Sequence, residues 1–131
     1  MNPLPMRQIH LDCHTSEHIT DVMAQFDPEE FADRLATAHV QSVNLFARCW
    51  HGWLYFDSQR FPDEVHPHLV RRNLLADQLR ACHQRGIRTP FYVGVQMASA
   101  VADRRPEWRQ VSIEGRLAGS APLEPGHRGP L

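Results

Sequence analysis

Histidine and carboxylate side chains alternate with apolar residues near the start of this sequence. His10, Asp12 and His14 are spaced two residues apart, with Ile9 and Leu11 among them. In an extended chain such residues share one face, because successive side chains point to opposite sides. Two imidazoles and a carboxylate on one face can bind a polar ligand through hydrogen bonds, and the same donor types suit a zinc ion.

Two later segments also end in polar and aromatic side chains. The apolar run that begins SVNLF at 42–46 changes into a guanidinium, an imidazole and two indoles, which belong to Arg48, Trp50, His51 and Trp53. The segment RTPFYVGVQ at 88–96 carries Tyr92 and ends in Gln96. Aromatic rings beside hydrogen-bonding groups suit a sugar, whose C–H faces stack on rings while its hydroxyl groups need donors and acceptors. We therefore expect the substrate-binding set to be His10, Asp12, His14, Arg48, Trp50, His51, Trp53, Tyr92 and Gln96.

Several of these residues also have an ordinary structural explanation. A single strand histidine such as His10 is more often a hydrogen-bonded core residue than a ligand-binding one. Trp53 and its aromatic neighbours more often pack in a core than serve as a sugar platform. His66 and His68 fit either solvated loop histidines or residues that lie behind a site. The binding hypothesis therefore depends on the convergence of the three segments.

Local signals predict strands for these three segments and helices between them. Asp27, Pro28 and Glu30 have the spacing of an N-cap, a first helical residue and a capping-box partner, so a helix should begin there. Gly86 follows a second helical pattern, where a left-handed C-terminal cap is needed. The expected strands are 6–13, 42–47 and 88–96, the second helix is 69–85, and loops cover 15–23 and 57–68. The expected apolar stripes are Phe31, Leu35 and Ala38 in the first helix and Leu75, Leu79 and Cys82 in the second.

The resulting order of strand, helix, strand, helix and strand predicts an α/β fold with parallel strands joined by right-handed crossovers. In such folds ligands bind at the carboxyl ends of the strands, whether the sheet is open or closed into a barrel. From residue 98 onward Gly, Pro and Arg become frequent, so 98–131 is expected to be loop-rich, with a small hairpin at 110–113. The 131 residues fit a single domain, 1–131.

The composition argues against several partners and chemistries. A formal net charge of −1 gives no electrostatic reason to expect nucleic acid or an anionic membrane as a partner. All 14 basic residues are arginine, so Schiff-base lysine chemistry is excluded within the chain. Cys13, Cys49 and Cys82 are odd in number and lack a CxxC spacing, which favours reduced thiols in the cytoplasm. The sequence shows neither a signal peptide nor a membrane-spanning run, and it implies no cofactor.

Four segments of the chain resemble the family catalogued as hypothetical glycoside hydrolase 6. They are RQIHLDCHTSEHI at 7–19, the stretch from FDPEEF to HGWLYF at 26–56, the stretch from HPHLV to YVGVQ at 66–96, and PEWRQV with EGR at 106–116. Two motifs make the resemblance specific, namely HxDxH at 10–14 and a basic residue followed by CxHGW at 48–53. The family is similar to the start of α-L-fucosidase-like barrels, so the resemblance implies a glycoside hydrolase of carbohydrate metabolism.

The second motif departs from the family at one position. The family usually has lysine, cysteine, histidine, histidine, glycine and tryptophan, whereas here Arg48 keeps the positive charge and Trp50 replaces the first histidine. Fucosidase-like enzymes use a histidine-rich motif at the similar place to hold sugar hydroxyl groups. The resemblance therefore assigns substrate binding first to Arg48 and His51, and Trp50 leaves the identity of the sugar open.

The resemblance also implies a (β/α)8 TIM barrel, which typically needs about 250 residues. This chain supplies a partial barrel followed by a long irregular or hairpin-containing segment. Glycoside hydrolysis ordinarily uses two carboxylates, and in fucosidase-like barrels the nucleophile follows a later strand. We therefore expect a carbohydrate-binding N-terminal part, either a truncated product or one piece of a larger enzyme, that is inactive alone. Asp12 would bind substrate or support residues that do.

Two other functions stay open. A metal-dependent hydrolase of amidohydrolase type is the first, because His10, Asp12 and His14 combine imidazole with carboxylate, although that class usually has HxH on its first strand. The second is a non-catalytic fragment, or a half-barrel whose exposed sheet edges are covered by other copies of the chain or by a polypeptide that supplies the remaining strands.

Overall fold

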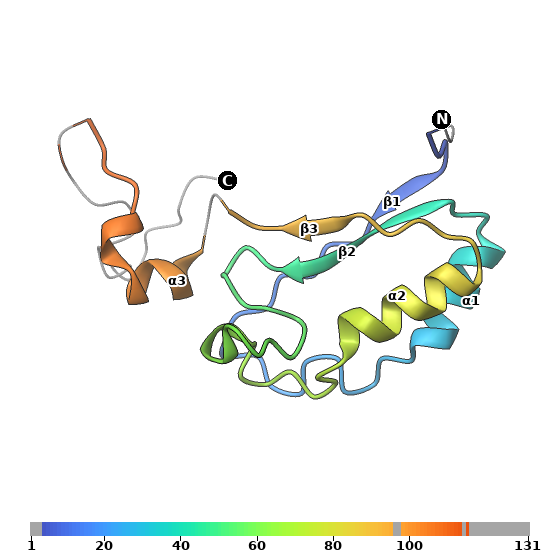
Figure 1. The fold of residues 1–131 in the computed structure, drawn as a ribbon, viewed down its shortest axis with the longest axis horizontal. Coiled ribbons are helices and arrows are strands. Elements are labelled where there is room, and N and C mark those ends of the chain that lie inside the picture. The colour runs from blue at the N-terminus through green and yellow to red at the C-terminus, as the bar shows by residue number, and fades with distance from the viewer. Residues whose placement is uncertain (1–3, 96–97, 114, 116–131) are drawn as a thin grey trace, which may run out of the picture.

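The computed structural model describes residues 4–95, 98–113 and 115. Its centre is a parallel sheet in the order β1-β2-β3, formed by β1 (Gln8–His10), β2 (Ser42–Arg48) and β3 (Phe91–Val93). Helices α1 (Pro28–Thr37) and α2 (Leu74–Gln84) lie together on one side of this sheet (Figure 1). The parallel α/β order expected from the sequence is therefore confirmed.

Strand β2 divides its side chains between the two faces of the sheet. Val43, Leu45 and Ala47 pack against the two helices, because alternate residues of a strand point the same way. Their buried partners on the helical side are Ala32, Leu35, Leu75, Ala81, Cys82 and Ile87. The opposite face of β2 carries Asn44, Phe46 and Arg48, which leaves that face to polar and aromatic groups.

Both helix-capping signals act at the ends of the helices as expected. The side chain of Asp27 accepts a hydrogen bond of 2.8 Å from the backbone N–H of Glu30, which makes it the N-cap of α1. The Glu30 carboxylate binds Arg34 instead of completing a capping box, with Oε1 2.6 Å from Nη2. Gly86 has a φ of +69° just after α2, where the left-handed cap was expected.

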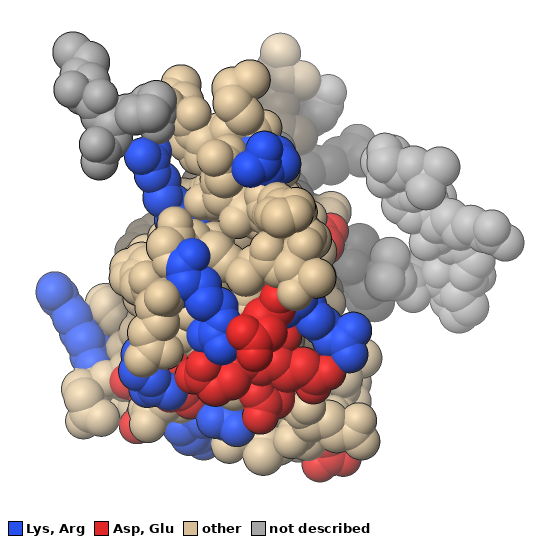
Figure 2. All heavy atoms as spheres, turned by 90° about the vertical axis from the view of Figure 1, so that its right-hand side faces the viewer, with Lys and Arg blue, Asp and Glu red and all other residues tan. Residues whose placement is uncertain are grey.

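Arg85 ties the end of α2 to the first turns of α1. Its Nη1 lies 2.9 Å from Glu29 Oε2, and its Nε lies 2.7 Å from Asp33 Oδ1. The hydrogen bond from this guanidinium lowers the pKa of the Asp33 carboxyl. Figure 2 shows acidic side chains gathered on the face that carries α1, with arginines around them. Charges of both signs meet there, so this face presents no continuous basic surface.

Helix α2 begins at Leu74 and not at residue 69, so the expected start of the second helix is wrong. Val22 forms a parallel bridge with Leu69, in which Val22 N donates to His68 O and Val70 N donates to Val22 O, both at 3.0 Å. These bonds tie 68–70 to Val22 outside any helix, and the helix begins only after them.

The outer strands and the first helical stripe also differ from expectation. Strands β1 and β3 are shorter than the expected 6–13 and 88–96, because each pairs with β2 along one edge. Ala38, expected on the stripe of α1, is the exposed C-cap residue. The fully buried residues of α1 are Pro28, Ala32 and Leu35.

Three short helical segments lie where loops were expected: η1 (Pro62–Glu64), α3 (Ser99–Arg104) and η2 (Pro106–Trp108). A small hairpin was expected at 110–113, followed by residues 114 and 115. In this stretch Gly115 N donates to Ser112 O at 2.9 Å, and residue 114 lies outside the described residues. Cys13, Cys49 and Cys82 are free thiols. Within the described ranges, no helix is long and apolar enough to cross a lipid bilayer.

Candidate functional site

Two imidazoles share one carboxylate oxygen at the carboxyl end of β1. Asp12 Oδ1 lies 3.1 Å from His10 Nε2 and 3.3 Å from His14 Nε2. The Asp12 side chain is 72% exposed, so the carboxylate remains open to solvent and to a ligand. The period-two spacing thus correctly placed these three residues in one group.

Strand β2 and the turn after it supply a hydrogen bond to the other nitrogen of each imidazole. Asn44, which lies opposite His10 in the parallel register, has its Nδ2 3.0 Å from His10 Nδ1. The backbone N–H of Trp50 donates to His14 Nδ1 over 2.9 Å. His10 is therefore hydrogen-bonded at both ring nitrogens, and His14 is hydrogen-bonded at Nδ1 with its Nε2 close to the Asp12 carboxylate.

Aromatic rings from the neighbouring strands pack against these imidazoles. Phe46 and Tyr92 face each other across β2 and β3 and stack with their centroids 4.4 Å apart. Both imidazoles contact these two rings, and His14 also meets Trp50 edge-on at 5.8 Å. Trp50 is 49% exposed, which leaves part of its indole free to meet a ligand.

Arg48 is the last residue of β2, and His51 lies in the tight turn that follows. Arg48 Nε donates to the carbonyl of Gly52 at 3.4 Å, and Gly52 N donates to Cys49 O at 3.0 Å. The carbonyl of His51 accepts a hydrogen bond of 3.1 Å from Ala100 N, so the turn is fastened to α3 through its backbone. Both side chains are half-buried.

Trp53 joins this turn to the loop that follows β1. Its indole N–H donates to Glu17 Oε2 at 3.2 Å, and the Arg104 guanidinium lies 5.6 Å from its ring centroid. A hydrogen bond from the Glu17 backbone, then the one from Trp53, lowers the pKa of the Glu17 carboxyl. Glu17 is thus an ionised carboxylate at neutral pH, 44% exposed beside the turn.

Two buried rings lie behind the β1 loop and hold its backbone. His66 is fully buried and has its Nε2 3.0 Å from Ser16 O, and burial lowers its pKa. Tyr55 is also fully buried, and its hydroxyl lies 2.6 Å from Thr15 Oγ1 and accepts from Thr15 N. Burial raises the pKa of Tyr55. These two residues belong to the scaffold behind the site, which was one of the two readings left open for His66.

Three contributors to this region were missed from the sequence. Asn44 and Phe46 were treated as part of an apolar strand, although a single amide within SVNLF was a usable signal. Glu17 lies in a segment without periodicity, so nothing local marked it. Of the expected set, the structure brings together His10, Asp12, His14, Trp50 and Tyr92, and it places Arg48, His51 and Trp53 around the adjoining turn. Gln96 lies outside the described residues.

The geometry does not favour the metal-dependent alternative. In the part of the chain that the structure describes, no three His, Cys, Asp or Glu side chains are grouped so that they could hold a metal ion. In particular, Nε2 of both His10 and His14 faces Asp12 at hydrogen-bond distance instead of a common empty point.

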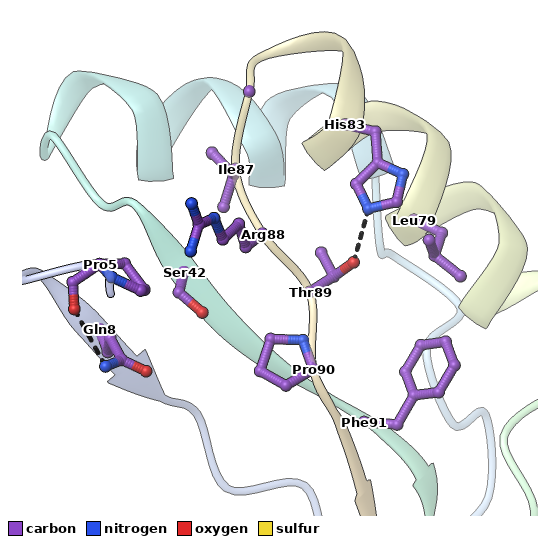
Figure 3. Close-up of a pocket in the computed structure, with 11 residues that line it drawn as sticks. Pro5, Gln8, Ser42, Leu79, His83, Ile87, Arg88, Thr89, Pro90 and Phe91 are labelled. Carbon is purple, nitrogen blue, oxygen red and sulfur yellow. Dashed lines mark hydrogen bonds between the residues drawn. The ribbon is translucent and has the colours of Figure 1, made fainter. Parts of the chain in front are cut away.

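A separate hollow lies at the other end of the sheet. It measures about 740 Å³ and lies between α2 and the segment that leads into β3, with Leu79, Ile87 and Pro90 in its lining. Figure 3 shows His83 and Thr89 joined across one side, with Nε2 2.8 Å from Oγ1. Because ligands of parallel α/β folds bind at the carboxyl ends of strands, we take the network of β1 and β2 as the candidate site and not this hollow.

Comparison with known proteins gives two informative matches. The family model described as hypothetical glycosyl hydrolase 6 matches residues 27–128. Among solved structures, the α-L-fucosidase isoenzyme 2 from Paenibacillus thiaminolyticus matches with a TM-score of 0.79 and 38% sequence identity. The match covers 88% of this chain and 17% of that one, so the chain spans less than a fifth of the fucosidase. No curated protein matches the sequence.

Proposed function

The chain belongs to the hypothetical glycosyl hydrolase 6 family, and on this basis we propose that it is the carbohydrate-binding first part of a (β/α)8 glycoside hydrolase. The sugar binds at the carboxyl ends of β1, β2 and β3. Hydrolysis requires further strands beyond the three that the structure describes. The likeness to an α-L-fucosidase makes a deoxy-hexose such as L-fucose the first sugar to examine.

The observation that carries this proposal is the cluster of His10, Asp12 and His14 against an aromatic floor. The open carboxylate of Asp12 accepts hydroxyl hydrogens, and the half-exposed Trp50 supports a C–H face of the ring. Tyr92 borders the same cluster from β3. Hydrogen-bonding groups beside exposed aromatic surface are the combination that a sugar requires.

Arg48 and His51 supply donors from the end of β2 and the turn after it. Among the described residues Arg48 donates through Nε alone, to the Gly52 carbonyl, so its terminal amino groups serve the sugar. His51 adds an imidazole on the same turn. Trp53 is a support for this turn through Glu17, and Gln96, which lies outside the described residues, stays a predicted substrate-binding residue.

The carboxylates available here support a binding role without turnover. A glycosidase needs a general acid, whose pKa must be raised, together with a second carboxylate. The pKa of Glu17 is lowered, so this residue is unsuited to donating a proton at neutral pH. Asp12 alone cannot supply both of the carboxylates that a glycosidase needs. The missing group comes from another polypeptide or from a longer form of this enzyme.

This proposal is tested by sugar binding and turnover in the same preparation. The chain is titrated with L-fucose, D-galactose and D-glucose while its amide resonances are followed by NMR, and aryl glycosides of the same sugars are assayed for hydrolysis. We expect millimolar binding of at least one sugar, with shifts confined to the loops after β1 and β2, and no turnover.

Two variants test whether Arg48 and His51 bind the sugar. His51→Ala and Arg48→Gln should each weaken binding about tenfold, the loss expected for a hydrogen bond with a charged or well-oriented partner. Arg72→Ala, which removes an exposed arginine 3.9 Å from Asp57, serves as the control and should bind normally. Absence of binding to every sugar tested would refute the carbohydrate role, and turnover by this chain alone would refute the missing carboxylate.

A further inference from the structure

The hydrogen bonds around His10 and His14 determine which ring nitrogen carries the proton in each neutral imidazole. We propose that Asn44 and the backbone N–H of Trp50 fix His10 and His14 as Nε2–H tautomers, and that Asp12, held between them, presents Oδ2 to a ligand hydroxyl group. The tautomer assignment stands on geometry alone. The ligand role of Oδ2 rests on the proposed function.

Asn44 is the positioning residue for His10. The parallel register places the two residues opposite each other on β1 and β2, and Asn44 Nδ2 lies 3.0 Å from His10 Nδ1. An amide nitrogen can only donate, so Nδ1 must accept. The proton of the neutral ring therefore resides on Nε2, which faces Asp12 Oδ1 at 3.1 Å.

The backbone of Trp50 has the same effect on His14. A peptide N–H is a donor that no side-chain substitution except proline removes, and that of Trp50 lies 2.9 Å from His14 Nδ1. The His14 proton is thus also on Nε2, 3.3 Å from Asp12 Oδ1. Two N–H groups from two different rings converge on a single oxygen.

This arrangement leaves the second carboxylate oxygen for a ligand. Among the described residues, Asp12 Oδ2 has no hydrogen-bond partner, and the side chain is 72% exposed. An ionised carboxylate only accepts hydrogen bonds, so the group that binds Oδ2 must be a donor. A sugar hydroxyl fits this requirement. Asp12 thus has two separable tasks, one for each oxygen.

The tautomers are tested by nitrogen-15 NMR of the imidazole rings at about pH 8, above the usual titration range of histidine. In the wild-type chain, both His10 and His14 should show a protonated Nε2 and an unprotonated Nδ1. Asn44→Asp replaces the donor by an acceptor, so carboxylates would face both ring nitrogens of His10, and Nδ1 should gain a proton while His14 stays unchanged. Asn73→Ala, at an N-cap position without a side-chain cap hydrogen bond, is the control and should change neither ring.

Asp12→Asn separates the two tasks of the carboxylate. Its amide oxygen can still accept from both rings, so the tautomers should persist, but the amide nitrogen now donates where Oδ2 accepted. L-fucose, or the sugar that binds best in the titration, should bind about tenfold more weakly, as expected for the loss of a hydrogen bond to a charged group.

The outcomes distinguish the two parts of the proposal. If Nδ1 of His10 stays unprotonated in Asn44→Asp, or if either wild-type ring carries its proton on Nδ1, the tautomer assignment is overturned. Undiminished sugar binding by Asp12→Asn overturns the ligand role of Oδ2. If the wild-type chain binds no sugar, the proposed function and the ligand role fail together, while the tautomer result stands independently.

Discussion

Gly52 is the residue on which the turn after β2 depends. Its φ is +94°, a value that side chains with a Cβ rarely adopt, and an added Cβ would lie 3.3 Å from both Ala98 Cβ and Val101 Cγ2. The residue therefore meets two separate requirements, a left-handed backbone and a close approach to α3. Arg48 and His51 depend on it, because both flank or contact the same turn.

Gly52→Ala should destabilise the fold by about 2–4 kcal/mol, combining about 1–2 kcal/mol for the left-handed backbone with the cost of overpacking. Gly86→Ala is the matched control, because Gly86 also has a positive φ of +69° but has nothing within 4 Å of an added Cβ. Gly86→Ala should lower the free energy of unfolding only by the contribution of the left-handed backbone. Urea denaturation of both variants measures the difference, and equal losses would show that the contact with α3 contributes nothing.

At the residue scale, the sequence predicted which residues of one segment lie together, but not which residues of distant segments contact each other. His10, Asp12 and His14 were predictable because their spacing alone places them on one face. Asn44 could not be assigned to His10, since that contact depends on the register of β1 against β2. Glu17 was not predictable for the same reason, because its partner Trp53 lies 36 residues away.

At the scale of elements, capping residues determine some helix ends locally. Pairing between distant segments determines where other elements begin. The caps at Asp27 and Gly86 were predictable because each acts within one turn of its own helix. The start of α2 was not, because the bridge between Val22 and Leu69 removes residues from the helix. The loop after β1 also depends on residues distant in sequence, because Tyr55 and His66 bind its backbone.

His66 provides the pH-dependent part of that support. Burial lowers its pKa in the folded chain, whereas the unfolded chain has the ordinary value of about 6.5. Above pH 7 both states are neutral at this residue, and no pH dependence arises. As the pH falls through about 6.5, the unfolded chain takes up a proton that the folded chain resists, so the free energy of unfolding decreases until the folded-state pKa is passed.

His66→Gln should therefore flatten the pH profile of stability. Urea denaturation at pH 8, 7, 6 and 5 is expected to show a smaller loss of stability below pH 7 in the variant than in the wild-type chain. The other histidines and the carboxylates titrate in both proteins and cancel in the comparison. Parallel profiles would show that His66 is protonated as easily in the folded chain as in the unfolded one.

At the scale of the whole molecule, the sheet is incomplete on both sides. Among the described residues, β1 and β3 each have a strand on one edge only. The parallel α/β order was predictable from the order of the elements, and the open edges follow from how few strands the structure describes. Strand β3 and the residues just after it also expose apolar side chains, with Phe91 52%, Val93 50% and Val95 80% exposed. In a closed barrel the next strand and helix would cover these groups.

An uncovered strand with apolar side chains is a template for association. We expect the purified chain to self-associate as its concentration rises and to bind an apolar dye, unless a polypeptide that supplies the remaining strands is present. Val93→Lys places a charge on this edge and should raise the apparent dissociation constant about tenfold, because burying an unpaired charge is costly.

Val70→Lys is the matched control for this last experiment, because Val70 is 56% exposed but belongs to the segment before α2 and not to the sheet edge. Sedimentation velocity over a range of concentrations should show Val70→Lys associating like the wild-type chain and Val93→Lys shifted toward monomer. Equal shifts in both variants would assign the association to general surface charge. A wild-type chain that remains monomeric and binds no dye would rule out the incomplete-barrel account, since the edge of β3 would then need no partner.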